Sequence, residues 1–365
     1  MDIDGIRRDI DGIDEALLDL LNRRAESVSE IGRLKEQNGA MVFDPPRERQ
    51  ILDRLSSLNR GPLDDEAIAE IFGAVFAVHR LLEKRLVVAY FGLAGTFSHI
   101  AARRKFGSAA DLRPAEAVAE VFHAVEKKEA DLGVVPIENT TAGVVPLTLD
   151  SLAESKLGIC AEVYVDIEHY LLSQCRDLTE IKRVYSHPQP IAQCRIWLRS
   201  NLPRVEVVSV GSTARAAELA AAEPEAAAIG PALAAEIYGV PILRERIQDE
   251  PDNRTRFFVI GHASASPSGR DKTSLVFAVP HKAGALHRAL GILSAHQINM
   301  TFIQSHPIKQ TPWEYMFFVD IEGHADQPQV SEALAELREQ TSVLRVLGSY
   351  PAYFPQEQND RPAPA

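Results

Sequence analysis

A threonine at position 255 lies between two arginines, Arg254 and Arg256, in the stretch DNRTRFFVIG of residues 252–261. The apolar run that follows is typical of a buried strand. Two cations at the start of a buried strand favour an anionic ligand, because a buried charge is costly unless an opposite charge meets it. Thr255 is therefore either a plain strand-edge residue or a hydroxyl group that acts on a bound carboxylate.

Four turns rich in glycine, serine, threonine or asparagine follow other predicted strands: GLAGTFSH (92–99), PIENTTAG (136–143), SHPQP (186–190) and GSTA (211–214). In an open α/β sheet, ligands bind outside the carboxyl ends of the strands, where helix N-termini favour anions. Serine, threonine and asparagine are also the usual helix caps, so capping is the better explanation of any single turn. Four such turns together with the two arginines favour an anion site.

Charged residues also interrupt the apolar stripes of helices predicted in the first 86 residues. Two rows that share a helix face combine apolar and polar side chains: Arg24, Val28, Ile31 and Lys35, and then Phe72, Phe76, His79 and Glu83. Arg24 falls seven residues after Leu17, on a row expected to be core, where a cation needs an anionic partner. Interhelical salt bridges and a site for an anion explain these charges equally well.

The elements that position these residues fall into zones of different composition. Residues 1–86 are predicted to be helical, with a first helix of about 30 residues whose apolar stripe is too long to be buried within this segment. We expect an intertwined homodimer to bury it. Residues 87–262 alternate strands and helices, which indicates α/β architecture with mostly parallel strands.

The C-terminal part of the chain has a different pattern. The segment ASASPSGRD, residues 263–271, has the composition of a flexible linker. Residues 272–351 follow the order βαββαβ, which is the ferredoxin-like signature of an α+β domain. Residues 352–365 are predicted to be disordered.

The composition argues against several classes of partner. A net charge of −12 disfavours nucleic acid and acidic membrane surfaces. The sequence has no apolar segment of about 20 residues that would span a membrane, and its first residues lack the apolar core of a signal peptide. Cys160, Cys175 and Cys194 show no metal-ligand spacing and are interpreted as reduced thiols. We therefore expect a cytoplasmic multidomain protein without a metal.

Residues 5–85 resemble the all-helical chorismate mutases, which form intertwined dimers. The resemblance is carried by the order Arg7, Asp14, Arg24, Lys35, Asp44, Arg47, Glu48 and Glu83. It implies that Arg24 and Arg47, with Arg7 of the partner subunit, hold the two carboxylates of chorismate, which suit bidentate guanidinium groups. Asp44, Glu48 and His79 are implied to contribute to the same site.

By the same resemblance, Lys35 and Glu83 hydrogen-bond the ether oxygen of chorismate as its C–O bond breaks. The rearrangement to prephenate is pericyclic, so the site needs only to hold the reactive conformer and stabilise charge in the transition state. Many family members have Gln in place of Glu83 and a small residue in place of His79. A carboxylate cannot donate a hydrogen bond, so Glu83 is expected to act in its protonated form.

Residues 87–262 resemble prephenate dehydratase, through five motifs in the family's order: GTFSH, PIENTTAG, SHPQPIAQC, GSTA and TRFFVIG. The resemblance implies two α/β lobes around a cleft, similar to type II periplasmic binding proteins. It makes Thr255 the group that assists loss of the ring hydroxyl of prephenate, and it makes Arg256 the group that binds a carboxylate. The other residues implied to line the cleft are Thr96, Ser98, Asn139, Ser186, Gln193, Ser212 and Thr213.

Residues 272–351 resemble an ACT domain, a small module that senses amino acids. Gly284, Ala285 and Leu286 match the effector-loop motif of that family. The stretch Gln304-Ser305-His306-Pro307 stands where related dehydratases have Glu-Ser-Arg-Pro, so Ser305 and Pro307 agree and the other two residues differ. The resemblance implies that phenylalanine binds at these two motifs.

Together the resemblances imply a bifunctional chorismate mutase and prephenate dehydratase of phenylalanine biosynthesis, inhibited by phenylalanine and without metal or organic cofactor. One alternative is an arogenate dehydratase, whose substrate differs from prephenate by a side-chain amine. The other is a non-catalytic solute-binding or amino-acid-sensing protein, since two-lobed clefts and ACT-like folds both occur in that class.

Overall fold

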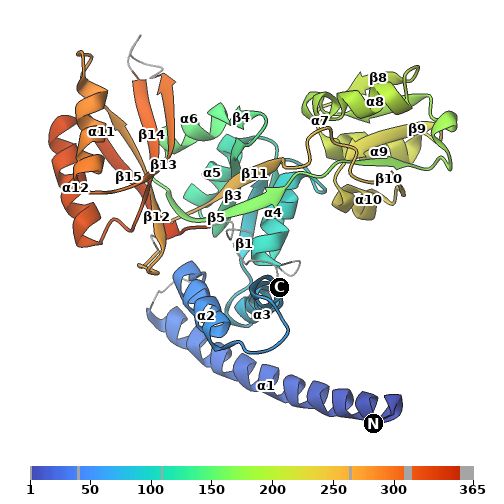
Figure 1. The fold of residues 1–365 in the computed structure, drawn as a ribbon, viewed down its shortest axis with the longest axis horizontal. Helices are drawn as coiled ribbons and strands as arrows, with labels where there is room; N and C mark the ends of the chain where they lie inside the picture. The colour runs from blue at the N-terminus through green and yellow to red at the C-terminus, as the bar shows by residue number, and fades with distance from the viewer. Residues whose placement is uncertain (1, 39–41, 108–109, 263–264, 308–314, 354–365) are drawn as a thin grey trace, which may run out of the picture. The chain divides into compact units, whose positions relative to one another are not determined.

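The computed structural model describes residues 2–38, 42–107, 110–262, 265–307 and 315–353 (Figure 1). The tail predicted to be disordered lies outside these residues from position 354 onward, as do residues 263–264 of the predicted linker. The chain divides into two compact units, one of residues 1–86 with 106–111 and one of residues 87–105 with 112–365. No helix of the described residues is long and apolar enough to cross a membrane.

The first unit consists of three helices, α1 (Ile3–Asn38), α2 (Pro45–Leu58) and α3 (Asp65–Glu83). Asp44 caps α2, because its carboxylate accepts a hydrogen bond from the backbone nitrogen of Arg47 at 3.1 Å. Two prolines occupy the first positions of α2, where a helix needs no backbone N–H. These capping features fix where α2 begins.

The N-terminal half of α1 leaves its apolar stripe uncovered in the single chain. Ile10, Ile13 and Leu17 are 50%, 58% and 50% exposed, and Figure 1 shows this half extending beyond α2 and α3. The C-terminal half of α1 packs against α3. A long exposed apolar stripe marks an interaction surface rather than a solvated face.

The second unit contains two α/β lobes. In lobe 1 the sheet runs β2-β1-β3-β11-β5, with β4 beside β3. Its strands are β1 (Val87–Phe91), β2 (Asp111–Ala115), β3 (Leu132–Asn139), β4 (Gly143–Val144), β5 (Gly158–Asp166) and β11 (Arg254–Gly261). Its helices are α4 (Phe97–Phe106), α5 (Val118–Glu126) and α6 (Pro146–Glu154).

In lobe 2 the sheet runs β10-β6-β9-β7-β8. Its strands are β6 (Tyr170–Ser173), β7 (Arg183–Ser186), β8 (Glu206–Ser209), β9 (Ala226–Gly230) and β10 (Ile242–Arg244). Its helices are the short η1 (Leu178–Glu180), α7 (Pro188–Gln193), α8 (Arg195–Asn201), α9 (Thr213–Ala222) and α10 (Ala232–Tyr238). Ala216, Ala217 and Ala220 of α9 are fully buried in one cluster with Ala226 and Ala228 of β9. Small side chains allow helix and strand to approach closely.

The expectation of mostly parallel strands is wrong. β1 and β3 are parallel, as are β7 and its two neighbours. β11 is antiparallel to both β3 and β5, because the chain leaves lobe 1 after β5 and returns along β11 in the opposite direction. This return places Thr255 between β3 and β5, near the end of β11 at which the chain comes back from lobe 2.

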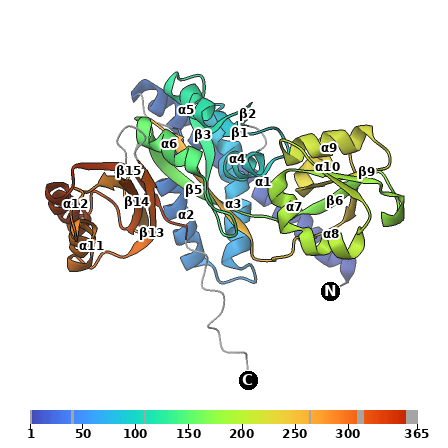
Figure 2. The same cartoon turned by 90° about the horizontal axis from the view of Figure 1, so that it is seen from above.

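The C-terminal part of the second unit has the predicted βαββαβ order. Its elements are β12 (Asp271–Ala278), α11 (Ala285–Ala295), β13 (Met300–Pro307), β14 (Tyr315–Glu322), α12 (Pro328–Gln340) and β15 (Val343–Pro351). The sheet runs β13-β14-β12-β15, and every pairing is antiparallel. Figure 2 shows α11 and α12 together on one side of this sheet, with lobe 1 beyond its other side.

This C-terminal sheet shares a core with lobe 1. Val276, Phe318, Leu347 and Tyr350 pack in the same buried cluster as Val135, Ile137 and Phe258 of lobe 1. β15 also crosses β5 closely, since a Cβ atom added at Gly348 would lie 2.0 Å from the carbonyl oxygen of Ile159. No larger residue fits at that position, so the contact between the two sheets is fixed by glycine.

Candidate active sites

In the helical unit, α1 and α3 bring Arg24, Lys35, His79 and Glu83 together. The Lys35 Nζ atom lies 2.8 Å from Glu83 Oε2 and donates a second hydrogen bond to the Val42 carbonyl oxygen at 3.3 Å. Arg24 Nη1 contacts His79 Nδ1. These residues come from α1 and α3, so the two predicted rows of mixed polarity face one another.

Arg24 has both a cationic and an anionic side chain near it, Arg47 and Glu83. Burial lowers the pKa of Arg24, and the nearby Arg47 lowers it further, whereas Glu83 raises it. Burial and Arg24 together lower the pKa of His79, which favours its neutral form. Two guanidinium groups close enough to repel one another attract a ligand with two carboxylates.

The other residues predicted for this site lie elsewhere or serve the helices. Arg7 is exposed and lies 3.4 Å from Asp4; it stands 17 positions before Arg24 on α1, which is about 25 Å along the helix. Glu48 pairs with Arg80 of α3, and both side chains are largely buried. Arg80, which sequence reasoning missed, also lies over the ring of Phe43.

In lobe 1, Thr255 and Asn139 are direct partners in the β11–β3 ladder, and both are buried. Asn139 Nδ2 donates to Thr255 Oγ1 at 2.8 Å. Asn139 Oδ1 accepts from the backbone nitrogens of Thr141 and Ala142 and from the Thr141 hydroxyl. These three donors fix the orientation of the amide, so the Thr255 oxygen accepts this hydrogen bond and its own proton takes no part in it.

Asn253 belongs to the same group and was not predicted. It is 2% exposed, and its Oδ1 accepts from Asn139 Nδ2 at 2.7 Å. The hydroxyl groups of Thr140 and Thr141 lie 3.3 Å from the same oxygen. The sequence feature that could have indicated Asn253 is its position two residues before Thr255, because residues i and i+2 of an extended chain lie on the same side.

Lobe 2 reaches this group through Gln193. Gln193 Nε2 donates to Thr141 Oγ1 at 2.9 Å, and its Oε1 lies 2.7 Å from His169 Nε2. Because the amide oxygen only accepts, His169 carries its proton on Nε2. Burial lowers the pKa of His169, although the hydrogen bond to Gln193 opposes this, so the ring is neutral near pH 7. A chain of hydrogen bonds thus connects lobe 2 to Thr255.

The remaining predicted cleft residues are divided between the lobes. Ser98 is buried on α4, and Thr96 donates to the carbonyl oxygen of Leu93 at 2.8 Å. The hydroxyl of Ser186 donates to the Ile229 carbonyl oxygen, Ser212 caps α9, and Thr213 is buried on α9. Ser186 and Ser212 therefore serve the fold of lobe 2.

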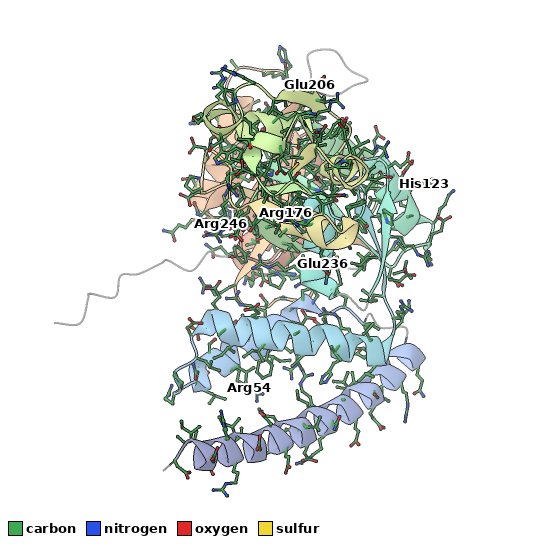
Figure 3. The ribbon with its side chains drawn as sticks, turned by 90° about the vertical axis from the view of Figure 1, so that its right-hand side faces the viewer. Arg54, His123, Arg176, Glu206, Glu236 and Arg246 are labelled. Atoms are coloured by element: carbon green, nitrogen blue, oxygen red, sulfur yellow. The ribbon has the colours of Figure 1, made fainter. Side chains whose placement is uncertain are left out.

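The two lobes also touch across α4 and α10. Tyr238 Oη donates to the Ala94 carbonyl oxygen at 3.1 Å, and Arg103 lies 3.5 Å from Glu236, which is labelled in Figure 3. These contacts join the two lobes at the GLAGTFSH turn and at α4. Within the described residues, no group of three or more His, Cys, Asp or Glu side chains is arranged to hold a metal ion.

Family models match three consecutive regions of the chain: type II chorismate mutase at residues 6–84, prephenate dehydratase at 88–265 and ACT domain at 273–339. A bifunctional chorismate mutase/prephenate dehydratase from Aquifex aeolicus (strain VF5) is 44% identical over 356 residues, which are 96% of this chain and 98% of that protein. This chain belongs to the bifunctional chorismate mutase/prephenate dehydratase family. It is an enzyme with an isomerase and a lyase activity of aromatic amino acid biosynthesis.

Two solved structures resemble the second unit. A prephenate dehydratase from Arthrobacter aurescens in complex with L-Phe is 35% identical with a TM-score of 0.68, and the match covers 73% of this chain and 90% of that one. A protein described as a novel type of quorum quenching acylase is 33% identical with the same TM-score, and the match covers 73% of this chain and 98% of that one.

Arg256 of the dehydratase domain does not lie where we expected it. Its guanidinium group donates to Glu162 Oε2 at 2.7 Å, to Asp320 Oδ2 at 2.6 Å and to Tyr350 Oη at 3.0 Å. Neighbouring side chains on a strand point to opposite faces, so Arg256 points away from Asn139. Burial alone would lower the pKa of Arg256, but Tyr350, Asp320 and Glu162 raise it well above its ordinary value.

The two ACT motifs lie on different elements. Gly284 precedes α11 with a φ of +76°, a conformation that favours glycine, and Ala285 and Leu286 begin the helix. Gln304 on β13 is half-buried, and its side chain donates to the carbonyl oxygen of Ser305 at 2.8 Å. His306 Nε2 donates to Asp150 Oδ1 at 2.7 Å, and Asp150 belongs to α6 of the dehydratase domain.

Proposed function

We propose that Thr255 and Asn139 form the catalytic pair of the dehydratase domain, acting on prephenate. The observation that carries this proposal is the direction of their hydrogen bond. Asn139 donates to the Thr255 oxygen, which leaves the hydroxyl proton available to the substrate and makes that hydroxyl a better donor through cooperative polarisation. Asn253 and Gln193 support the pair, because they hold Asn139 and Thr141 in position.

The dehydration of prephenate needs a hydrogen-bond donor at the ring hydroxyl that departs. The electrons of the ring C–O bond leave with the hydroxyl, which takes up a proton from the solvent and departs as water. The electrons of the bond to the ring carboxylate enter the ring as carbon dioxide departs, and the ring becomes aromatic. Thr255 donates to the departing hydroxyl, which stabilises the charge that develops on its oxygen. No base or nucleophile is required.

Substitution of Thr255 tests this role. We expect Thr255→Ala to lower kcat for prephenate by about 10²- to 10⁴-fold, because the donor to the leaving group is lost. Thr255→Ser keeps a hydroxyl and should retain most of the activity. The mutase activity of both variants on chorismate controls for a folded protein. Full prephenate turnover by a folded Thr255→Ala variant would rule out the proposal, and the same assay with arogenate decides between the two substrates.

For the mutase domain, we propose that Arg24 and Arg47 hold the two carboxylates of chorismate, and that Lys35 and Glu83 act at its ether oxygen. The proximity of the two guanidinium groups supports the first part, and the Lys35–Glu83 contact supports the second. We further propose that the protein is a homodimer in which Arg7 of the partner subunit completes this site. The uncovered apolar stripe of α1 supports the dimer.

We also propose that phenylalanine binds to the ACT domain and inhibits the dehydratase. A related prephenate dehydratase was solved in complex with L-Phe, and this chain has the βαββαβ domain with Gly284, Ala285 and Leu286 at the start of α11. Ser305 and Pro307 on β13 provide the second motif. The three free, buried cysteines fit a reducing compartment, so we place the enzyme in the cytoplasm.

A further inference from the structure

A buried group of charged residues lies on the face of β11 opposite Thr255. We name it the inter-domain charge cluster; its members are Arg256 and Glu162 of the dehydratase domain and Lys272, Ser274, Asp320 and Tyr350 of the ACT domain. All six are less than 9% exposed. Two cations and two anions balance one another in this cluster, so each charge depends on its partners.

Hydrogen bonds connect every member of the inter-domain charge cluster. Arg256 binds Glu162, Asp320 and Tyr350 through three separate nitrogen atoms. Lys272 Nζ lies 3.1 Å from Glu162 Oε1. Ser274 Oγ donates to Asp320 Oδ1 at 2.5 Å and lies 2.6 Å from Tyr350 Oη. Asp320 of β14 and Tyr350 of β15 thus hold the guanidinium group of Arg256 directly. Lys272 and Ser274 of β12 hold the partners of that group.

This connection constrains the position of Thr255. Adjacent residues of a strand share one peptide unit, so a shift of Arg256 shifts the Thr255 Cα atom with it. Thr255 contacts Asn139 on one face, whereas Arg256 is held by ACT residues on the other. Displacement of a catalytic group by about 1 Å can cost about 10²-fold in rate.

We propose that Arg256 is a positioning residue for the dehydratase reaction, and that the inter-domain charge cluster couples the ACT sheet to Thr255. The proposal rests on the proposed role of Thr255. It assigns to the cluster a function beyond holding two domains together: the ACT sheet sets the position of the catalytic hydroxyl. Any rearrangement of the ACT sheet then reaches the active site through one side chain.

The chain offers a matched control for plain domain docking. Arg345 of β15 donates to the carbonyl oxygens of Leu152, Ala153 and Ser155 at the end of α6. It therefore joins the ACT domain to lobe 1 without contacting β11. Substitution of Arg345 weakens docking alone, whereas substitution of Asp320 removes a charge that Arg256 requires.

The test is a double-mutant cycle on kcat for prephenate. We expect Asp320→Asn to lower kcat about tenfold with KM nearly unchanged, and Ser274→Ala to do the same more weakly. In a Thr255→Ala background, Asp320→Asn should have no further effect on the residual rate. Arg345→Met should lower the melting temperature but leave kcat unchanged, and mutase activity should persist throughout.

Two results would overturn the proposal. One is an equal loss of kcat on Asp320→Asn with and without Thr255, because the cluster would then act on the fold. The other is an equal loss in the Arg345→Met control. If Asp320→Asn does not fold, the Ser274→Ala variant is carried through the same cycle with the same criteria. If Thr255→Ala itself leaves kcat unchanged, the proposed function fails, which is a separate outcome.

Discussion

Glu83 of the mutase domain pairs with Lys35, whose Nζ atom lies 2.8 Å from Glu83 Oε2. In the proposed complex a dianionic substrate lies beside this carboxylate. Nearby negative charge favours the protonated form of a carboxylate. Only the protonated form donates a hydrogen bond to an ether oxygen. Under the proposed mutase mechanism, Glu83 therefore pairs with Lys35 in the free enzyme and donates to chorismate in the complex.

We predict that mutase kcat falls as the pH rises and Glu83 ionises in the complex. The protonated form is the active one, so activity is present at the lower pH and lost at the higher. Glu83→Gln should flatten this dependence, because an amide donates at any pH. The measurement is kcat for chorismate between about pH 5 and 9 in parent and variant.

His79 needs a control in that experiment. Burial and Arg24 lower its pKa, so its ring gains a proton only on the acidic side of its usual range. His79→Ala should therefore alter the acidic limb of the profile and leave the decline at higher pH in place. A profile that Glu83→Gln does not change would show that Glu83 is no donor in the reaction.

The residues around Thr255 were predicted from the sequence only in part. Thr255 and Asn139 were predicted from motifs, and the structure joins them directly. Asn253 and His169 were missed, since their contacts depend on how β11 and the crossing between the lobes are placed. The alternation of side chains along a strand indicates that Arg256 faces away from Thr255, but nothing near it in the sequence shows that Asp320 lies there.

At the scale of elements, α1 carries residues that a single chain cannot bring together. Arg7 and Arg24 lie about 25 Å apart on the same straight element, so both reach one chorismate only if a second subunit supplies one of them. The sequence predicted this helix from its periodicity and its need for a partner from its uncovered stripe. It did not predict the antiparallel return of β11, because pairing direction follows from the path of the chain between lobes.

We predict complementation between two inactive mutase variants. Arg7→Ala and Arg24→Ala should each abolish mutase activity in a homodimer. In a mixture refolded at equal amounts, half the dimers are mixed, and each has one intact site of two, so about a quarter of the activity returns. The measurement is chorismate turnover, with prephenate dehydration as a control that should remain constant. Absence of recovery despite mixed dimers would place both residues in one subunit's site.

At the scale of the molecule, the two activities reside in separate compact units, while the ACT domain shares its core and its buried charges with the dehydratase domain. An effector that binds the ACT domain therefore reaches the dehydratase through contacts already formed. An inhibitor must bind one state of this assembly more tightly than another, since equal binding shifts nothing.

The second ACT motif, residues 304–307, contacts the dehydratase domain. His306 stands where relatives have arginine, and its ring donates to Asp150 of α6, so this position faces the dehydratase domain as well as the motif. Gln304, at the place of a glutamate, bonds only to a neighbouring backbone oxygen among the contacts described. Gln304 replaces a carboxylate by a neutral amide, and His306 replaces a guanidinium group by an imidazole ring.

We therefore predict that phenylalanine inhibits this dehydratase more weakly than it inhibits relatives with the full Glu-Ser-Arg-Pro motif. The double variant Gln304→Glu with His306→Arg should lower the half-inhibitory concentration about tenfold or more, since a hydrogen bond to a charged group contributes about 1.5–3 kcal/mol. The assay is prephenate turnover over a range of phenylalanine concentrations. An Asp150→Asn variant tests whether His306 acts through α6 or on the effector itself. If that single substitution changes inhibition, His306 acts through its contact with Asp150 of α6. Equal inhibition in the parent and the double variant would mean that neither position senses the effector.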